Sequence, residues 1–380
     1  MIDDVTAGGG VNTANSTVYN CSLMEEKKKM SFNNKPGKTE YMVIGRFKEE
    51  VKTVNNEVRK GLINRVKEHK MLGTWVDESG KYEININKKK EKLPYMISTT
   101  KKDASPKTVG IYTVESRLKL AETVIIPSIL NDIEGFPVLK GAEIKKLESM
   151  QLNILTDILE LPRSTPYCAL LMEVGWWPMK ARIAYKKLML YHNIMRSGKK
   201  RVARKLVIEQ EKEARKTTWL ASVKEEIEIY KISLNVMETL KSTWKREVKK
   251  QINKEVEEEI RKLCVTSKKS RVVRNDNYEA KEYLKGAVNL QTAKKILRTR
   301  LNMAWLPGNY KKDGKGLCPL CEEEEGSTEH YFHCKHVSLL AKVWQVTPED
   351  LGSQEVSKMK DVARFFEKVE IMINPERTTR

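Results

Sequence analysis

The sequence predicts a mostly α-helical protein that has a small α/β part at its N-terminus. Apolar residues between positions 142 and 161 recur at steps of three and four, which is typical of an amphipathic helix. A second apolar stripe repeats almost every fourth residue from Leu240 to Leu263 and predicts a longer helix. Two short β-prone runs, 40–45 and 71–76, predict the strand-containing part near the N-terminus.

The chain is long enough for two or three domains, and its net charge limits the class of partner. Its 380 residues carry a formal net charge of +20. So large a positive excess favours a polyanion, with nucleic acid the first expectation and an anionic membrane surface the second. No apolar run approaches the roughly 20 residues that span a bilayer. We therefore expect nucleic acid, and no membrane, as the partner.

Three of the cysteines, Cys21, Cys168 and Cys264, are isolated in the sequence. They imply no disulfide framework, which fits a reducing compartment. The first four residues, Met-Ile-Asp-Asp, offer neither the basic start nor the apolar core of a signal peptide. An intracellular location, in the nucleus or the cytoplasm, is the expectation that follows.

Two adjacent carboxylates, Asp3 and Asp4, follow the short β-prone stretch at the start of the chain. Such a pair suits a hairpin turn that holds a divalent metal ion, although an Asp-Asp pair is more often an ordinary polar turn. Beyond it, apolar periodicity and helix breakers predict the remaining elements. They are a helix-permissive stretch at 13–30, strands at 40–45 and 71–76, a turn at 77–80, and helices at 142–161, 179–196, 240–263, 278–305 and 356–369.

The most basic run of the sequence lies just after the helix expected at 179–196. Its cations are Lys199, Lys200, Arg201, Arg204 and Lys205. A run of this kind either tracks a phosphate backbone or serves nuclear import. A solvated helix face is the alternative interpretation of the same residues.

Cysteine and histidine gather near the C-terminus in the pattern Cys-x2-Cys-x8-His-x3-Cys. The set Cys318, Cys321, His330 and Cys334 predicts a closed tetrahedral site of the kind that holds structural zinc. His333 or His336 could replace His330 as the fourth ligand, and free cytosolic thiols are the alternative to a metal site. Four acids at 322–325 should repel phosphate, so we expect neighbouring helices to carry the nucleic-acid contact.

Six short motifs also occur in an order that resembles a known family, the reverse transcriptases of non-LTR retrotransposons, from the palm Asp-Asp motif onward. The motifs are Met1-Ile-Asp-Asp4, Asn34-Lys-Pro-Gly-Lys38-Thr39, Met71-Leu72-Gly73, Leu161-Pro-Arg-Ser-Thr-Pro166, Leu171-Met-Glu-Val-Gly175, and Asn309-Tyr310 ahead of Cys318-Pro-Leu-Cys321. The resemblance covers nearly the whole chain, and residues 112–131 look like the first helices of the family's thumb.

The resemblance implies roles for individual residues in an RNA-directed DNA polymerase. Asp3 and Asp4 would bind Mg²⁺, and Lys38 would lie near the incoming triphosphate. Leu72 and Gly73 would help to hold the primer end. The partners implied are an RNA template and a DNA primer or target.

The resemblance also implies a division of the chain into five parts. These are a palm remnant with the primer-grip hairpin (1–95), a helical thumb (96–197), a basic helical connector (198–310), a Cys/His zinc element (311–340) and a C-terminal helical tail (341–380). The family's metal set takes carboxylates from two palm strands, and here only the second pair is present. We therefore expect a fragment that binds nucleic acid without polymerising. A non-enzymatic zinc-containing nucleic-acid-binding protein and a decayed scaffold are the alternatives.

Overall fold

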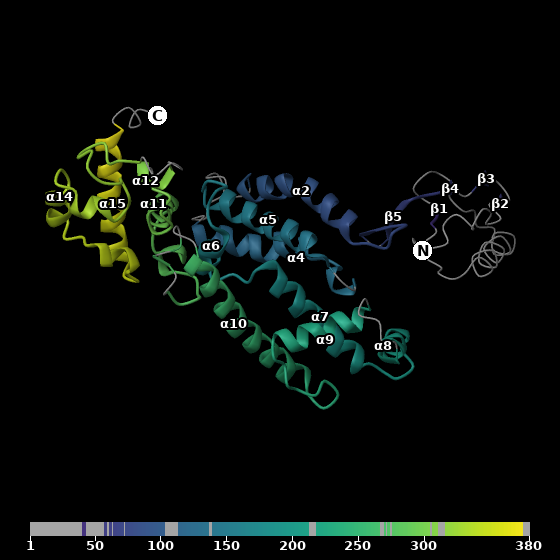
Figure 1. Cartoon of the computed structure of the whole chain (residues 1–380). Coiled ribbons are helices and arrows are strands. Elements are labelled where there is room, and N and C mark those ends of the chain that lie inside the picture. The colour runs from purple at the N-terminus through teal and green to yellow at the C-terminus, as the bar shows by residue number, and fades with distance from the viewer. Residues whose placement is uncertain are drawn as a thin grey trace. The chain divides into compact units, whose positions relative to one another are not determined.

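The structure of the chain is a computed structural model (Figure 1). It describes residues 40–42, 57–58, 61–62, 64–71, 73–102, 113–136, 139–212, 218–266, 270, 272–273, 276–304, 306–310 and 316–374. The described part is mostly helical with a few short strands near the N-terminus, as the sequence predicts. The chain divides into two compact units, Met1–Lys89 and Lys90–Arg380. None of the described helices is long and apolar enough to cross a membrane.

The first unit contains three two-stranded sheets among its described residues. β1 (Glu40–Tyr41) pairs in parallel with β4 (Asn64–Arg65), β2 (Glu57–Val58) pairs antiparallel with β3 (Gly61–Leu62), and β5 (Glu68–Met71) pairs antiparallel with β6 (Thr74–Asp77). Of the strand predicted at 40–45, residues 43–45 lie outside the described part, as does the stretch 13–30.

The prediction of a single strand over 71–76 is wrong, because the chain reverses between Met71 and Thr74. Gly73 occupies this turn with a φ of 95°, a conformation that glycine adopts without a steric penalty. The turn predicted at 77–80 is confirmed. There the backbone N–H of Gly80 donates to the Asp77 carbonyl at 3.0 Å.

Helix α2 (Glu83–Lys102) starts beside this hairpin and is fixed to it within the first unit. The side chain of Asn85 accepts a hydrogen bond from the backbone N–H of Trp75 at 2.8 Å. The Lys88 ammonium lies 5.1 Å from the centre of the Trp75 ring, a cation–π distance. Tyr82, just ahead of α2, and Ile86, in its first turn, are buried.

After the rest of α2, the second unit continues with a run of helices, several of which pack against α7. They are α3 (Val114–Leu120), the π-helical turn η1 (Ala121–Ile125), α4 (Ile126–Ile129), the 3₁₀ turn η2 (Ile133–Gly135), α5 (Gly141–Ile158), α6 (Tyr167–Val174), α7 (Met179–Met195), α8 (Val202–Lys212), α9 (Trp219–Ile229) and α10 (Lys241–Thr266). Helix α7 packs against α5, α9 and α10 (Figure 1). Fully buried Leu147, Leu188 and Trp244 belong to the core between these helices.

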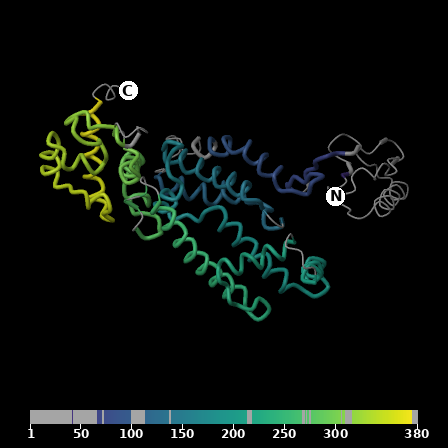
Figure 2. The backbone as a smooth tube through the Cα atoms, in the orientation of Figure 1, coloured from purple at the N-terminus to yellow at the C-terminus, as the bar shows by residue number. Residues whose placement is uncertain are grey.

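The remaining elements follow α10 toward the C-terminus, which Figure 2 traces from green to yellow. They are the 3₁₀ turn η4 (Glu282–Leu284), α11 (Leu290–Arg300), α12 (Pro307–Tyr310), α13 (His330–His333), α14 (Ser338–Val343), the 3₁₀ turn η5 (Pro348–Gly352) and α15 (Val356–Ile373). The helices predicted at 142–161, 179–196, 240–263 and 356–369 are confirmed as α5, α7, α10 and α15.

The continuous helix predicted over 278–305 is wrong, since among the described residues of that span only α11 is α-helical. Gly286 has a φ of 85°, which interrupts a right-handed helix. Asn289 then caps α11, because its side chain accepts a hydrogen bond from the backbone N–H of Thr292 at 2.9 Å. A local cap therefore outweighs the apolar periodicity that suggested a longer helix.

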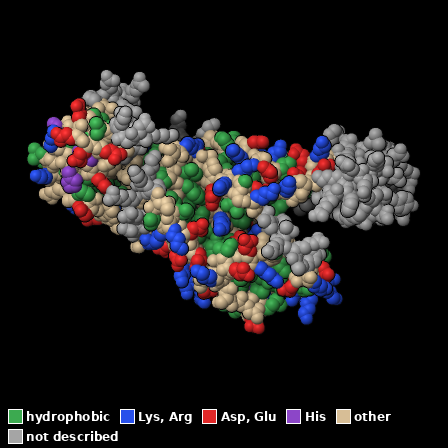
Figure 3. Space-filling model, viewed as in Figure 1, with side chains coloured by type: hydrophobic (Ala, Val, Ile, Leu, Met, Phe, Trp, Pro, Cys, Tyr) green, Lys and Arg blue, Asp and Glu red, His purple; other side chains and the backbone are tan. Residues whose placement is uncertain are grey.

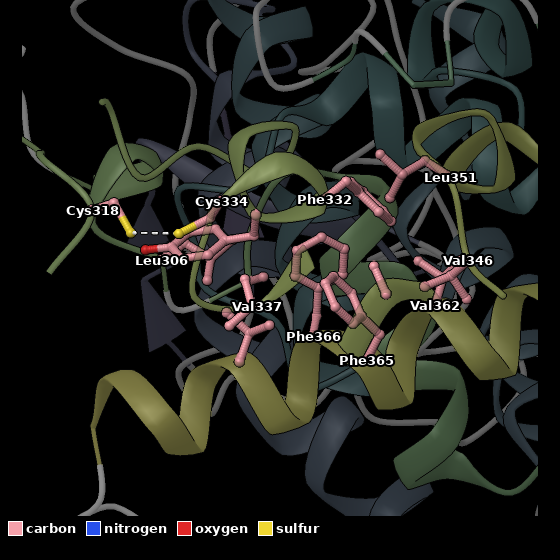
Figure 4. Packing of buried hydrophobic residues seen from close by; sticks show 14 residues of the cluster. Leu306, Cys318, Phe332, Cys334, Val337, Val346, Leu351, Val362, Phe365 and Phe366 are labelled. Carbon is pink, nitrogen blue, oxygen red and sulfur yellow. Dashed lines mark hydrogen bonds between the residues drawn. The ribbon is translucent and has the colours of Figure 1, made fainter. Parts of the chain in front are cut away.

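Residues 304–373 share one hydrophobic core and are called the C-terminal module below. Its centre is an aromatic triad, Phe332 from α13 with Phe365 and Phe366 from α15 (Figure 4). The three ring centroids lie 5.0 to 5.3 Å apart, in stacked and edge-to-face arrangements. The expected zinc element and the expected C-terminal tail are thus packed on each other.

A buried ion network joins the C-terminal module to the helices before it. Arg300, at the end of α11, is 2% exposed. Its guanidinium donates to Glu173 of α6 at 2.8 Å, to Asp276, and to the carbonyl of Leu351 at 2.8 Å. Tyr283 donates to the second oxygen of Glu173. Each buried charge therefore has an opposite charge and further hydrogen bonds, which limits the cost of burying it.

Candidate metal centre

A tight hairpin places the first two candidate ligands, Cys318 and Cys321. The backbone N–H of Cys318 donates to the Glu324 carbonyl at 2.7 Å, and that of Glu322 donates back to the Cys318 carbonyl at 2.8 Å. Glu322 has a φ of 59°, the left-handed conformation that lets the chain reverse directly after Cys321. Both thiols consequently project from one turn.

The short helix α13 supplies the other two candidate ligands. His330 is its first residue, and Cys334 follows its last. The backbone N–H of Cys334 donates to the His330 carbonyl at 2.8 Å, so one helical turn separates the two side chains. Both side chains therefore face the Cys318–Cys321 turn.

Glycines allow the backbone segments around the hairpin to touch. A Cβ atom at Gly326 would lie 2.8 Å from the Tyr331 hydroxyl and 3.2 Å from Cα of Cys318. One at Gly308 would lie 2.8 Å from the backbone of Gly326. Any larger residue at either position would push the hairpin away from α12 or from α13.

The four ligand atoms are already arranged as a metal site. All lie within 4.8 Å of one another. The sulfurs of Cys318 and Cys334 are 3.8 Å apart (Figure 4), and Sγ of Cys321 lies 3.4 Å from Nε2 of His330. With Zn–S near 2.3 Å and Zn–N near 2.0 Å, tetrahedral coordination requires about 3.8 Å and about 3.5 Å for these separations. These two separations match those of a zinc site, so the cluster is compatible with Zn²⁺.

The structure selects among the three candidate histidines. His330 is 9% exposed and faces the thiols, whereas His333 and His336 are exposed. Histidine side chains are visible on the surface of this part of the molecule in Figure 3. Cys318 and Cys334 are buried and Cys321 is half-buried. Of the three candidates, His330 is therefore the histidine placed to act as the fourth ligand, whereas His333 and His336 are exposed to solvent.

The environment of Cys318 favours its thiolate. Burial opposes the charge, but backbone N–H groups of Cys321 and Leu320 donate to the sulfur and lower the pKa of Cys318 to about 7. Burial raises the pKa of Cys334 to about 11. A metal ion binds thiolates. The Cys318 thiol therefore loses its proton easily, whereas the Cys334 thiol would lose its proton to the incoming ion.

Two residues that the spacing pattern does not reveal support the ligands. Nδ1 of His330 is hydrogen-bonded to Glu324 at 2.9 Å, which leaves Nε2 to face the thiols. Burial lowers the pKa of His330, but this bond together with the hydrogen bonds and charge of the neighbouring thiols raises it overall. A carboxylate on the distal nitrogen is the usual partner of a zinc-bound histidine. The sequence signal for this partner was an acid six residues before the candidate histidine, but that acid is one of four consecutive glutamates.

Tyr331 is the second supporting residue. Burial and the neighbouring Cys318 sulfur raise the pKa of its hydroxyl. That buried oxygen has no well-formed hydrogen bond among the described residues. A thiolate is a far better acceptor than a thiol, so a metal-bound Cys318 would satisfy it.

The chemistry open to this site is structural. Three thiols and one imidazole would complete a tetrahedral shell, and these four side chains are the group that meets there among the described residues. With no open position, a bound ion would have no water to activate. It would instead join the hairpin to α13.

The residues that the resemblance assigns to catalysis receive no comparable support. Asp3, Asp4, Lys38 and Leu72 lie outside the described residues. Gly73 is described, and it forms the turn of the β5–β6 hairpin. A magnesium site and a primer grip therefore stay predictions.

The basic run ahead of α8 is largely open to solvent. Lys199, Lys200, Arg201 and Lys205 are exposed, and Arg204 is half-buried with its guanidinium on the Ser197 carbonyl at 2.6 Å. Four cations are thus available to a partner, and one serves the local fold.

Comparison with known proteins adds no family to this description. No protein-family model matches the chain, no curated protein is significantly similar to it, and no solved structure matches it. The Cys3His centre and the basic run are consequently interpreted from their own chemistry.

Proposed function

We propose that this chain binds nucleic acid as the C-terminal part of a reverse-transcriptase-like protein, with zinc as a structural ion in its C-terminal module. The observation that carries the proposal is the exposed basic run Lys199–Lys205, which contains no acidic residue. Excess surface cations bind phosphates by releasing condensed counterions, and the net charge of +20 adds to this attraction.

The zinc centre supports this proposal through the fold rather than by contact. Two of the four glutamates in its hairpin are already engaged, since Glu323 pairs with Lys335 at 2.5 Å and Glu324 with His330. These acids would still repel a phosphate backbone. Zinc would hold the module together while cations of the helices meet the nucleic acid.

The catalytic part of the proposal rests on sequence resemblance alone. Asp3 and Asp4 would bind Mg²⁺, and Lys38 would neutralise the leaving pyrophosphate in a complete active site. The sequence offers one of the two carboxylate sets that such a site requires. We therefore expect residues 1–380 to extend no primer on an RNA template, and nucleotide incorporation above background would refute that expectation.

The experiment that tests the proposed function is a binding titration across a salt series. The zinc-loaded chain would be titrated against a primer–template hybrid, single-stranded RNA and duplex DNA. Binding that persists as salt rises, with preference for the hybrid or the RNA, would support a reverse-transcriptase-like role. Equal binding to all three supports the alternative, a non-enzymatic nucleic-acid-binding protein. Absence of binding even at low salt would overturn both.

A further inference from the structure

Helix α10 presents one apolar stripe to the protein and its other faces to solvent. Trp244, Val248, Ile252, Val256 and Ile260 are all buried, at successive steps of four residues. They pack against α6 and α7. The residues between them therefore form a continuous outward surface along 26 residues of helix.

The first half of that surface is strongly basic. Its exposed cations are Lys241, Lys245, Arg246, Lys249, Lys250 and Lys254. None of them forms an ion pair within the described part of the chain. The one acid in this half, Glu247, accepts a hydrogen bond from Gln251 at 2.8 Å. Like charges four residues apart repel each other, so this arrangement does not serve the stability of the helix.

The charge order along α10 also opposes the helix dipole. Cations fill the N-terminal half, where the dipole is positive, and Glu255, Glu257, Glu258 and Glu259 stand in the C-terminal half. In that second half two of the acids form ion pairs, Glu257 with Arg261 at 2.8 Å and Glu255 with Lys231 at 2.7 Å. A charge order that disfavours the helix in this way is typical of a surface that binds a partner.

The start of α10 lies at the same end of the helix packing as the run Lys199–Lys205. The two helices α7 and α10 are antiparallel, since Trp244 stacks on His192 at 5.5 Å while Trp177 donates to Asn253 at 2.6 Å. Arg196, at the end of α7, donates to the Met237 carbonyl just ahead of α10 at 2.6 Å. The basic half of α10 thus starts near the run Lys199–Lys205 and continues from there along the length of α7.

We propose that Lys245, Arg246, Lys249, Lys250 and Lys254 form a second contact surface for the phosphate backbone of a nucleic-acid duplex, beside the run Lys199–Lys205. This inference rests on the proposed function and identifies where and how the duplex is held. Residues four apart on a helix are about 6 Å apart along its axis, and Lys241 to Lys254 spans about 20 Å. A straight row of cations suits a regular backbone, and a duplex carries twice the charge of one strand over that length.

The test compares two variants of equal charge change in the zinc-loaded full chain. Lys245→Gln/Lys249→Gln/Lys250→Gln removes three cations of the proposed surface, and Lys342→Gln/Lys360→Gln/Lys368→Gln removes three from α14 and α15. The probes are a labelled 20-base-pair DNA duplex, its single strand, and phosphatidylserine vesicles, each titrated at several salt concentrations. The α10 variant should bind the duplex about 10- to 100-fold more weakly, with a salt slope lower by about 2 to 3.

The outcomes separate this inference from the proposed function. Equal loss in the two variants, or no loss in either, would overturn the α10 surface while duplex binding by the unaltered chain keeps the proposed function. A preference of the unaltered chain for the single strand or for vesicles would overturn the duplex as partner. Lys245→Arg/Lys249→Arg/Lys250→Arg keeps the charges and should retain binding; loss in that variant would indicate a damaged fold and reject a purely electrostatic contact.

Discussion

Single residues in the C-terminal module have structural roles that their sequence context does not suggest. Glu324 is one of four consecutive glutamates, and its side chain is 73% exposed, yet it alone contacts His330. The contact fixes which imidazole nitrogen is free for a metal ion. Its neighbours Glu322 and Glu325 make no such contact, which provides an internal comparison.

We predict that Glu324→Gln weakens zinc binding about tenfold, the lower end of the effect known for such outer carboxylates, because the side chain is exposed to water. Glu325→Gln, which changes the same charge one residue away, should leave zinc affinity unaltered. Competition with a chromophoric chelator measures both affinities. Equal losses in the two variants would show that only the total charge of the hairpin matters.

A second residue, Glu226 of α9, titrates in an unusual range. Burial raises the pKa of its carboxyl from 4.5 to about 7, although Lys187 opposes the shift. One of its oxygens is buried with no hydrogen-bond partner among the described residues. Between pH 4.5 and 7 the folded chain holds a proton that the unfolded chain releases. The contribution of Glu226 to stability therefore falls as pH rises through this window and stays low above it.

We predict that Glu226→Gln stabilises the chain at pH 8 by on the order of 1 kcal/mol, a rise of roughly 2–4 °C in melting temperature, because the neutral amide avoids the buried charge. At pH 5 the two proteins should melt together. Glu225→Gln, an exposed neighbour, serves as the control and should show no difference that depends on pH. A lower melting temperature for Glu226→Gln at pH 8 would mean that the electrostatic attraction between Glu226 and Lys187 outweighs burial.

At the scale of elements, the network around Arg300 explains a motif that the sequence alone left without a physical role. Glu173 belongs to Leu171-Met-Glu-Val-Gly175 and is fully buried. Its two oxygens accept from Arg300 and Tyr283. Gly175 has a φ of 65°, and a Cβ there would lie 2.5 Å from the backbone nitrogen of Ala280. The end of α6 is therefore where the chain before and after α10 meets.

We predict that Arg300→Ala destabilises the second unit by about 3–5 kcal/mol, because it leaves the buried carboxylates of Glu173 and Asp276 without their partner. Lys295 lies on the same helix as Arg300 and forms an exposed ion pair with Glu367 of α15. Lys295→Ala should therefore cost at most about 1 kcal/mol. Chemical denaturation of the zinc-loaded chain gives both values. A comparable, small loss in the two variants would show that water enters and solvates the network.

The elements also show what the sequence could and could not predict. The ligands Cys318, Cys321 and Cys334 were predictable because their spacing is local, and α10 because its apolar stripe is regular. Glu173 and Arg300 were not predicted to pair, since 127 residues separate them and nothing periodic connects them. The prediction of a continuous helix across 278–305 was wrong because one glycine and one capping asparagine override a pattern of apolar residues.

At the scale of the whole molecule, a zinc ion at the Cys3His centre and the hydrophobic core would stabilise the C-terminal module together. Its ligands lie in the hairpin and α13, whereas the ring of Phe332 next to them packs on α15. Removing the ion would separate the hairpin from α13 and leave several buried thiols and one imidazole without a partner. The helices around α7 are held together by contacts that do not involve the ion.

We predict that chelation of zinc unfolds the C-terminal module while α5, α7 and α10 stay folded. Amide hydrogen exchange should then rise sharply in residues 316–373 and little in residues 141–195, because only the former depend on the ion. Re-addition of Zn²⁺ should restore protection, and Mg²⁺ should not, since it disfavours thiolate ligands. Uniform loss of protection along the chain would mean that the module and the helices unfold as one unit.

The dependence of the Cys3His hairpin on α15 has a consequence for how the protein is made. All four ligands leave the ribosome before residues 356–373, which supply Phe365 and Phe366 to the same core. A nascent chain paused at that point holds a complete ligand set on an unsupported scaffold. Zinc captured then would be bound by an open, exchangeable site, and only the last helix would convert it into a buried one. Synthesis of α15 would thus be the step after which a bound ion is held in a buried site.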